Sequence, residues 1–122
     1  MTSAAGKTKL ETLSLSHLHL PARDPETLKK WYCETLGFKP NGFTIWSGGT
    51  VLAFGPGDPI KNEQLHFGFR VSSVEVLKQW QATLRATGME IEDLHGDGTY
   101  QSFYCSDPEG NDLEFFWEEV PA

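Results

Sequence analysis

The sequence YQSFYCSDPEGNDLEFFW, residues 100–117, predicts two β-strands joined by a tight turn. Ser102 to Cys105 alternates small and aromatic residues, and Leu113 to Trp117 is apolar except for Glu114. The DPEGN segment between them places proline early and glycine late, as turns do. A carboxylate in an apolar strand is costly to bury unless it is paired or bound to a metal. Glu114 is therefore the first candidate functional residue.

Length, charge and cysteine content limit the class of protein. A chain of 122 residues is long enough for one core, so we expect residues 1–122 to form a single domain. The net charge of -7 disfavours binding to nucleic acid. No apolar run is long enough to span a membrane, and the polar N-terminal residues are unlike a signal peptide. Two cysteines are too few for a disulfide framework. These features predict a cytoplasmic protein without nucleic acid or membrane as a partner.

The first half of the chain predicts a strand, a helix and two shorter strands. His17 and His19 lie on the polar face of the first strand, whose other face is apolar. Asp24 is suited to begin the helix, and Gly37 is suited to end it. The predicted ranges are 13–20 for the first strand, 25–36 for the helix, and 43–46 and 51–54 for the later strands, with a linker at 55–64.

The same order of elements is repeated after the linker. Aligning the two halves places His17 on His66 and Trp31 on Trp80, so one unit of strand, helix and three strands occurs twice. The predicted ranges are 65–71 for the strand, and 89–94, 100–105 and 113–117 for the later strands. The helix between them has Ser72 in a capping box, an apolar stripe from Val74 to Leu84, and Gly88 at its end. We expect an α+β fold of two modules, at about 12–56 and 64–118, whose sheets form a curved, half-open cup with the helices outside.

Three residues on three predicted strands could hold a metal ion. His17 and His66 take equivalent places on the first strands of the two modules, and Glu114 lies on the last strand. Two imidazoles and one carboxylate make a facial triad with open coordination positions, which is typical of non-haem Fe(II) and related ions. A single strand histidine is more often structural. The alternative for Glu114 is a salt bridge to Arg70.

Three stretches of the chain resemble the vicinal oxygen chelate superfamily, which includes glyoxalase I, bleomycin-resistance proteins, fosfomycin-resistance enzymes and extradiol dioxygenases. These stretches are HLHLPARDPETLKKWYCETLGF, LHFGFRV and SFYCSDPEGNDLEFFW. The resemblance implies paired βαβββ modules and usually a homodimer. It also implies a metal held by a histidine on the first strand, a histidine on the fifth and a glutamate on the eighth, which fall on His17, His66 and Glu114.

Within this superfamily the C-terminal stretch is most similar to extradiol ring-cleaving dioxygenases. The spacing of His95, the SFY triplet that ends at Tyr104, and Glu114 repeats the pattern of those enzymes. The resemblance implies that a catechol chelates iron through two adjacent oxygens, and that Tyr104 and His95 hydrogen-bond the reacting oxygens. Residues 51–64 hold no counterpart of the family's acid–base histidine, and His19 is the candidate to replace it. We expect an oxidoreductase with Fe(II), and Mn, Zn or Ni as alternatives.

Three other functions stay open. Glyoxalase I has a fourth ligand on the last strand of its first module, where this chain has Leu52. Fosfomycin thiol transferases share the SFY and DPEG motifs but have a threonine where this chain has His19. Bleomycin-resistance proteins are acidic, generally lack the metal triad and bind a cationic drug in a dimer cleft. The charge of the chain fits that class, as do four aromatic residues, Trp46, Tyr100, Tyr104 and Phe116.

Overall fold

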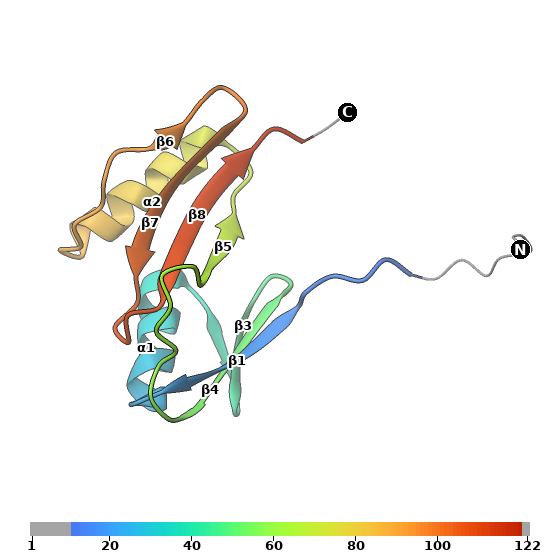
Figure 1. The fold of residues 1–122 in the computed structure, drawn as a ribbon, viewed down its shortest axis with the longest axis vertical. Helices are drawn as coiled ribbons and strands as arrows, with labels where there is room; N and C mark the ends of the chain where they lie inside the picture. Colours follow the sequence, from blue (N-terminus) through green and yellow to red (C-terminus); the bar gives the residue numbers. More distant parts are fainter. Residues whose placement is uncertain (1–10, 121–122) are drawn as a thin grey trace, which may run out of the picture.

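The fold is that of a computed structural model, and the structure describes residues 11–120. Within this range the chain forms two helices and eight strands (Figure 1). In chain order they are β1 His17–Ala22, α1 Pro25–Leu36, β2 Lys39–Asn41, β3 Thr44–Ser47, β4 Thr50–Pro56, β5 His66–Arg70, α2 Val74–Ala86, β6 His95–Gly96, β7 Tyr100–Ser106 and β8 Asp112–Glu118. None of the helices in this range is long and apolar enough to cross a membrane.

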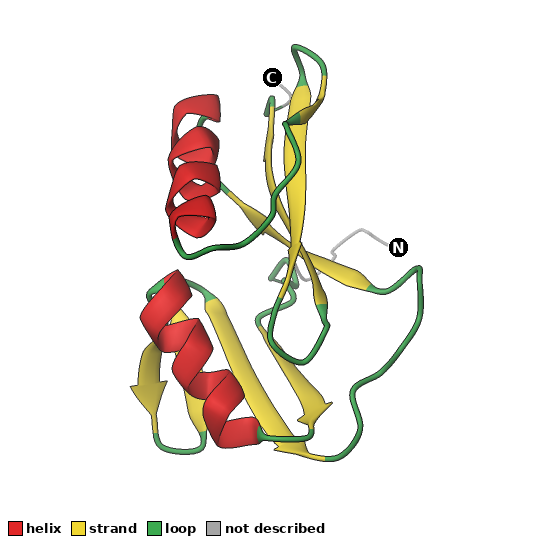
Figure 2. Ribbon diagram, turned by 90° about the vertical axis from the view of Figure 1, so that its left-hand side faces the viewer, coloured by secondary structure: helices red, strands yellow, loops and turns green. Residues whose placement is uncertain are grey.

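Each half of the chain forms its own four-stranded mixed sheet. The strand order is β1-β4-β3-β2 in the first sheet and β5-β8-β7-β6 in the second. In both sheets the first and last strands of the half are parallel neighbours, and the other neighbours are antiparallel. One helix packs against each sheet, α1 against β4 and α2 against β8, as Figure 2 shows. The predicted fold class is therefore confirmed: the unit of strand, helix and three strands occurs twice, and the sheets do not close into a barrel.

The first helix begins where the capping chemistry predicts, and the second begins one residue later than predicted. The Asp24 side chain accepts a hydrogen bond from the Thr27 amide at 3.1 Å, and Gly37, at φ 78°, ends α1 in the left-handed region that favours glycine. The cap of α2 is Ser73, which accepts from the Val76 amide. Ser73 is the position that matches Asp24 in the repeat, so the capping box predicted at Ser72 is wrong by one residue.

Three strand predictions differ from the structure. β1 begins only at His17, so the predicted part at 13–16 is not a strand. β2 lies at Lys39–Asn41, a short edge strand around Pro40 that has no apolar alternation to reveal it. No strand forms at 89–94, and the sixth strand is the two-residue β6. The backbone carbonyls of Ile91 and Glu92 are instead bonded to side chains of α2, those of Arg85 and Gln81.

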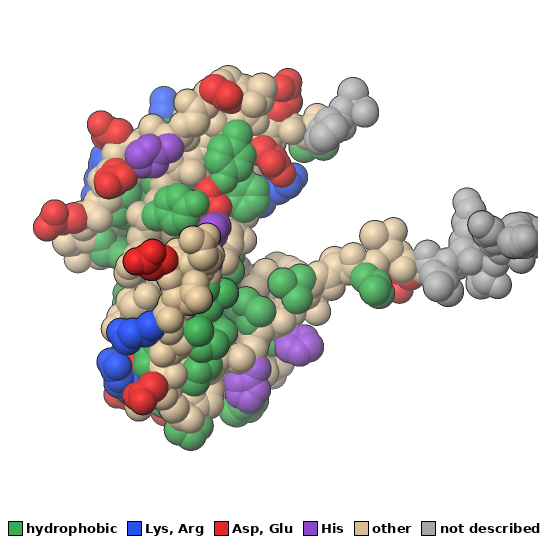
Figure 3. All heavy atoms as spheres, in the orientation of Figure 1, with side chains coloured by type: hydrophobic (Ala, Val, Ile, Leu, Met, Phe, Trp, Pro, Cys, Tyr) green, Lys and Arg blue, Asp and Glu red, His purple; other side chains and the backbone are tan. Residues whose placement is uncertain are grey.

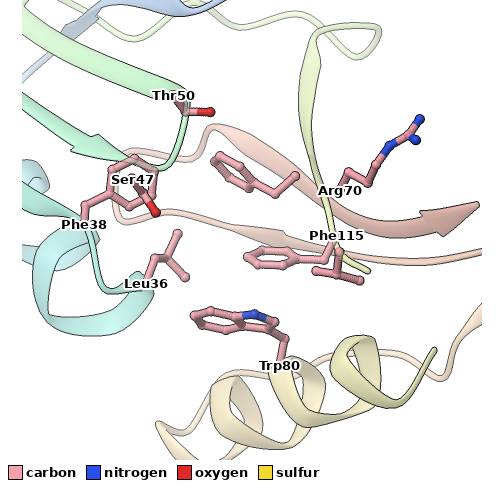
Figure 4. Close-up of a pocket in the computed structure, with 9 residues that line it drawn as sticks. Leu36, Phe38, Ser47, Thr50, Arg70, Trp80 and Phe115 are labelled. Atoms are coloured by element: carbon pink, nitrogen blue, oxygen red, sulfur yellow. The ribbon is translucent and has the colours of Figure 1, made fainter. Parts of the chain in front are cut away.

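The two halves meet on the helix side of the sheets. Rings from both halves touch there: Phe38 lies 6.1 Å from Phe69 between ring centres. A cavity of about 180 Å³ remains at this junction. Figure 4 shows Leu36 and Phe38 of the first half facing Phe115 and Trp80 of the second across it. The hydrophobic core is therefore continuous from one half to the other.

The DPEGN turn between β7 and β8 joins the second half to α1. Asp107 is buried and accepts a hydrogen bond of 2.7 Å from the hydroxyl of Tyr32, and its other contacts go to amides of the same turn. The Glu109 carboxylate accepts from the backbone amides of Arg23 and Asp24, at 2.8 and 2.9 Å. The turn therefore fixes the second hairpin against the start of the first helix.

Candidate functional site

Glu114 lies on the face of the second sheet that points away from α2. Its neighbours Leu113 and Phe115 belong to the core, so the alternation along β8 turns Glu114 to the opposite face. The residues beside it in the register are Gly68 on β5 and Tyr104 on β7. Glu114 is nevertheless only 8% exposed. The structure thus has a nearly buried carboxylate on the sheet face, as the sequence pattern predicts.

His66, at the start of β5, approaches this carboxylate. Its Nε2 atom lies 3.5 Å from Oε1 of Glu114. The ring of Tyr104 meets the His66 ring edge-on, with 5.4 Å between the ring centres. Two ligand atoms about 2.1 Å from one cation, at an angle of about 90–110°, lie about 3.0–3.4 Å apart. The His66–Glu114 spacing is close to this range, so these two side chains fit a shared divalent ion.

Tyr100 is a further site residue, and no sequence pattern places it with the proposed metal ligands. Its hydroxyl donates a hydrogen bond to Oε2 of Glu114, from the beginning of β7. Burial, together with this bond, raises the pKa of Tyr100 to about 12, so the phenol keeps its proton at neutral pH. Burial and the charge of Glu114 also raise the pKa of Tyr104. In the sequence, Tyr100 lies an even number of positions from Tyr104 and therefore on the same face of the sheet. The strand register alone does not show how far a tyrosine side chain reaches along a strand.

Arg70 does not neutralise Glu114. Its guanidinium forms an ion pair with Glu118 and lies over the ring of Phe116, 5.6 Å from the ring centre. In Figure 4 its side chain extends away from the junction between the halves. The alternative predicted from the sequence, a salt bridge between Arg70 and Glu114, is therefore wrong, because Arg70 pairs with Glu118.

His17 lies on the first sheet, on the face opposite its core neighbour Leu18. His17 and His66 line the same cavity, of about 300 Å³, between the two halves. Within residues 11–120 of one chain, no group of three or more His, Cys, Asp or Glu side chains is placed to hold a metal ion. Figure 3 shows histidines on both the upper and the lower half of the molecule, with two side by side on the lower half. One chain therefore brings two of the three predicted ligands together.

The two other histidines lie outside the His66–Glu114 pair. His19, on β1, packs edge-on against Phe43 with 5.5 Å between ring centres. Gly55 allows this placement, because a Cβ atom there would be 3.1 Å from Nε2 of His19. His95, on the short edge strand β6, is 2.8 Å from the Glu92 carboxylate. The structure therefore gathers His66, Tyr104 and Glu114 of the predicted residues, and adds Tyr100.

A family model matches residues 14–115 of the chain, that of the Glyoxalase/Bleomycin resistance protein/Dioxygenase superfamily. The matched range extends from just before β1 into β8 and includes Glu114. Among curated proteins, no sequence matches the chain.

Several solved structures have a similar fold. The fosfomycin resistance protein FosX from Listeria monocytogenes has a TM-score of 0.75 at 18% identity, covering 90% of this chain and 97% of that one. A glyoxalase family protein from Bacillus anthracis has a TM-score of 0.70 at 22% identity, covering 92% and 100%. The oxidase ChaP-H1 has a TM-score of 0.70 at 21% identity, covering 91% and 100%. At these identities the similarity shows the fold.

Proposed function

Because the chain belongs to the Glyoxalase/Bleomycin resistance protein/Dioxygenase superfamily, we propose that it is a divalent-metal-dependent enzyme acting on a small substrate with two adjacent oxygens. Extradiol-type ring-cleaving oxygenation is the proposed chemistry. The proposed ligands are His17, His66 and Glu114, with Fe(II) favoured and Mn, Zn or Ni as alternatives. The observation that carries the proposal is the close pair of His66 and Glu114 on one sheet face.

The environment of Glu114 supports a cation at this place. The carboxylate is nearly buried, and its polar neighbours are a tyrosine hydroxyl and an imidazole. The nearby guanidinium, that of Arg70, pairs with Glu118. A buried carboxylate without a full positive charge beside it is costly. A divalent cation between Glu114 and His66 would supply that charge.

We propose that the third ligand comes from a second copy in a homodimer. His17 points from the face of the first sheet, and the His66–Glu114 pair of the same chain lies outside its ligating range. Large apolar side chains are exposed in the first half of the chain, namely Leu13 at 94%, Leu15 at 84% and Phe43 at 60%, and Leu15 lines the same cavity as His17. An exposed apolar surface of this kind is typical of a protein–protein interface. Two copies would cover it and bring His17 of one to the pair of the other.

The residues around the pair have defined tasks in this proposal. A bound divalent ion would supply Lewis acidity for two adjacent substrate oxygens. Tyr104 stands beside His66 with its hydroxyl protonated and would donate a hydrogen bond to one of those oxygens. His19 lies on the same sheet face as His17 and would serve as the acid–base group if that face is brought across by the second copy. His95, bonded to Glu92 at the sheet edge, would reach the substrate only by leaving that partner.

Metal analysis of the purified protein tests the proposal. Wild type should carry stoichiometric divalent metal, whereas Glu114→Gln should lose it by at least about tenfold, because the replacement removes a charged ligand. Glu75→Gln is the control, since Glu75 is an exposed glutamate in the first turn of α2. Equal trace metal in wild type and Glu114→Gln would overturn the proposal and favour a metal-free ligand-binding protein.

A second measurement tests the chemistry. Protein loaded anaerobically with Fe(II) and then mixed with oxygen and a panel of catechols should form a yellow ring-fission product. Tyr104→Phe should lower kcat by about 10²-fold or more with metal content unchanged, because a proton donor is lost and no ligand is. Bound metal without ring fission for any catechol would reject oxygenation and favour lyase or transferase chemistry.

A further inference from the structure

The two oxygens of the Glu114 carboxylate have different neighbours. Oε1 lies 3.5 Å from Nε2 of His66, whereas Oε2 accepts a hydrogen bond from the hydroxyl of Tyr100. A carboxylate that binds a metal through one oxygen leaves the other free for a second hydrogen-bond partner, and such partners orient metal ligands. Tyr100 holds the oxygen that does not face His66.

The ring of Tyr100 is itself held in place by an aromatic stack. It lies against the ring of Phe116 at 5.9 Å between ring centres, with 23° between their planes. The guanidinium of Arg70 is also 5.6 Å from the Phe116 ring centre and is anchored by its ion pair with Glu118. Tyr100 is thus packed against a ring that has its own fixed support.

Gly68 makes the position of Phe116 possible. A Cβ atom at Gly68 would lie 2.9 Å from Cε1 and 3.2 Å from Cδ1 of the Phe116 ring. Distances this short require the ring to move. A residue with a side chain at this position would therefore displace Phe116, and with it the ring of Tyr100. Contacts run without a break from Gly68 through Phe116 and Tyr100 to the candidate ligand Glu114.

We propose that Tyr100 is a positioning residue that sets the orientation of the Glu114 carboxylate for metal binding, and that Gly68 and Phe116 hold Tyr100 in place. This inference rests on the proposed metal site. Without the hydroxyl, Oε2 of Glu114 loses its partner, and the carboxylate is free to rotate or to bind through both oxygens. Removal of such an outer partner typically weakens metal affinity about 10- to 100-fold.

Cobalt(II) titration of the metal-free protein tests the role of Tyr100, because the visible absorption of bound cobalt reports its coordination. Tyr100→Phe should bind cobalt about 10- to 100-fold more weakly than wild type and show altered visible bands. Tyr32→Phe is the matched control, since it also removes a tyrosine hydroxyl that donates to a carboxylate, that of Asp107. It should leave cobalt affinity and spectrum unchanged.

Gly68→Ala provides a second variant that keeps every ligand and the Tyr100 hydroxyl. It should weaken cobalt binding in the same direction as Tyr100→Phe, and it replaces that variant if Tyr100→Phe does not fold by circular dichroism. Wild-type affinity and spectrum in either folded variant would overturn the positioning role while the metal site stands. An equal loss of cobalt affinity in Tyr32→Phe would also overturn the positioning role, because the loss would then be a general effect on folding. No cobalt binding by wild type would overturn the metal site, and the inference with it.

Discussion

At the scale of single residues, Asp107 shows how one carboxylate joins distant parts of the chain. It is buried, and it accepts from the hydroxyl of Tyr32 as well as from amides of its own turn. Tyr32 lies in the core, where the pKa of its phenol is raised by burial and then by the charge of Asp107. The buried hydroxyl therefore depends on Asp107 for its hydrogen bond.

Replacing Asp107 by alanine should lower the free energy of unfolding by about 1–3 kcal/mol, because it leaves the Tyr32 hydroxyl buried without an acceptor. Urea denaturation followed by tryptophan fluorescence measures the change. Asp112→Ala is a suitable control, because Asp112 is also an aspartate of this hairpin but is exposed. A similar loss in both variants would mean that the buried bond is not the cause.

The candidate site is partly predictable from individual residues. Glu114 stands out because it interrupts an apolar strand, and His66 stands out because it repeats the place of His17. The bond from Tyr100 to Glu114 is not predictable in this way, since it joins residues that are not opposite each other: the register pairs Tyr104 with Glu114 and Tyr100 with Glu118. Side-chain reach along a strand depends on rotamers that packing decides.

At the scale of elements, the helices and the long strands follow from periodicity and capping, whereas the sixth strand does not. Met89 to Glu92 alternates as a strand would, yet the segment has no strand partner. Its carbonyl groups are satisfied by α2 instead: Gln81 donates to Glu92 O at 2.7 Å, and Arg85 donates to Ile91 O. A local pattern cannot reveal that a helix side chain will compete for those carbonyls.

Gln81→Ala should loosen the segment at 89–94, because the carbonyl of Glu92 then loses its donor. A protease that cuts after glutamate should cleave at the exposed residues Glu90 and Glu92 several-fold faster than in wild type. Mass spectrometry of the fragments locates the cuts. Gln79→Ala, an exposed glutamine of the same helix, should leave the cleavage rate unchanged. Equal rates in the Gln81 variant and wild type would show that its hydrogen bond does not hold the segment.

At the scale of the whole molecule, the two sheets carry different parts of the proposed metal site. The repeat of strand, helix and three strands is visible in the sequence because His66 and Trp80 match His17 and Trp31. How the two units are placed relative to each other is not visible there, since it depends on contacts such as Phe38 with Phe69. This placement decides whether His17 meets the His66–Glu114 pair of its own chain or of another.

Mixing two defective variants tests the homodimer. His17→Ala and Glu114→Ala should each bind little metal alone. After joint unfolding and refolding, mixed dimers should regain one intact site, because each site takes His17 from one copy and Glu114 from the other. Metal content per dimer is the measurement.

The control mixture combines His66→Ala with Glu114→Ala, which damage the same half of the site and should regain nothing. No recovery in the first mixture, despite mixed dimers proven by mass spectrometry, would mean that the ligands do not come from two copies.

The turn that holds α1 has a consequence for how a substrate could enter. Tyr32 and Asp107 are both buried, so parting them would leave the Tyr32 hydroxyl without its acceptor. This bond and those of Glu109 to Arg23 and Asp24 oppose a change in the angle between the halves, so the entrance between them would keep its width. Substrate entry would then depend on the size of the compound, as in a molecular sieve, and not on a hinged closure around it.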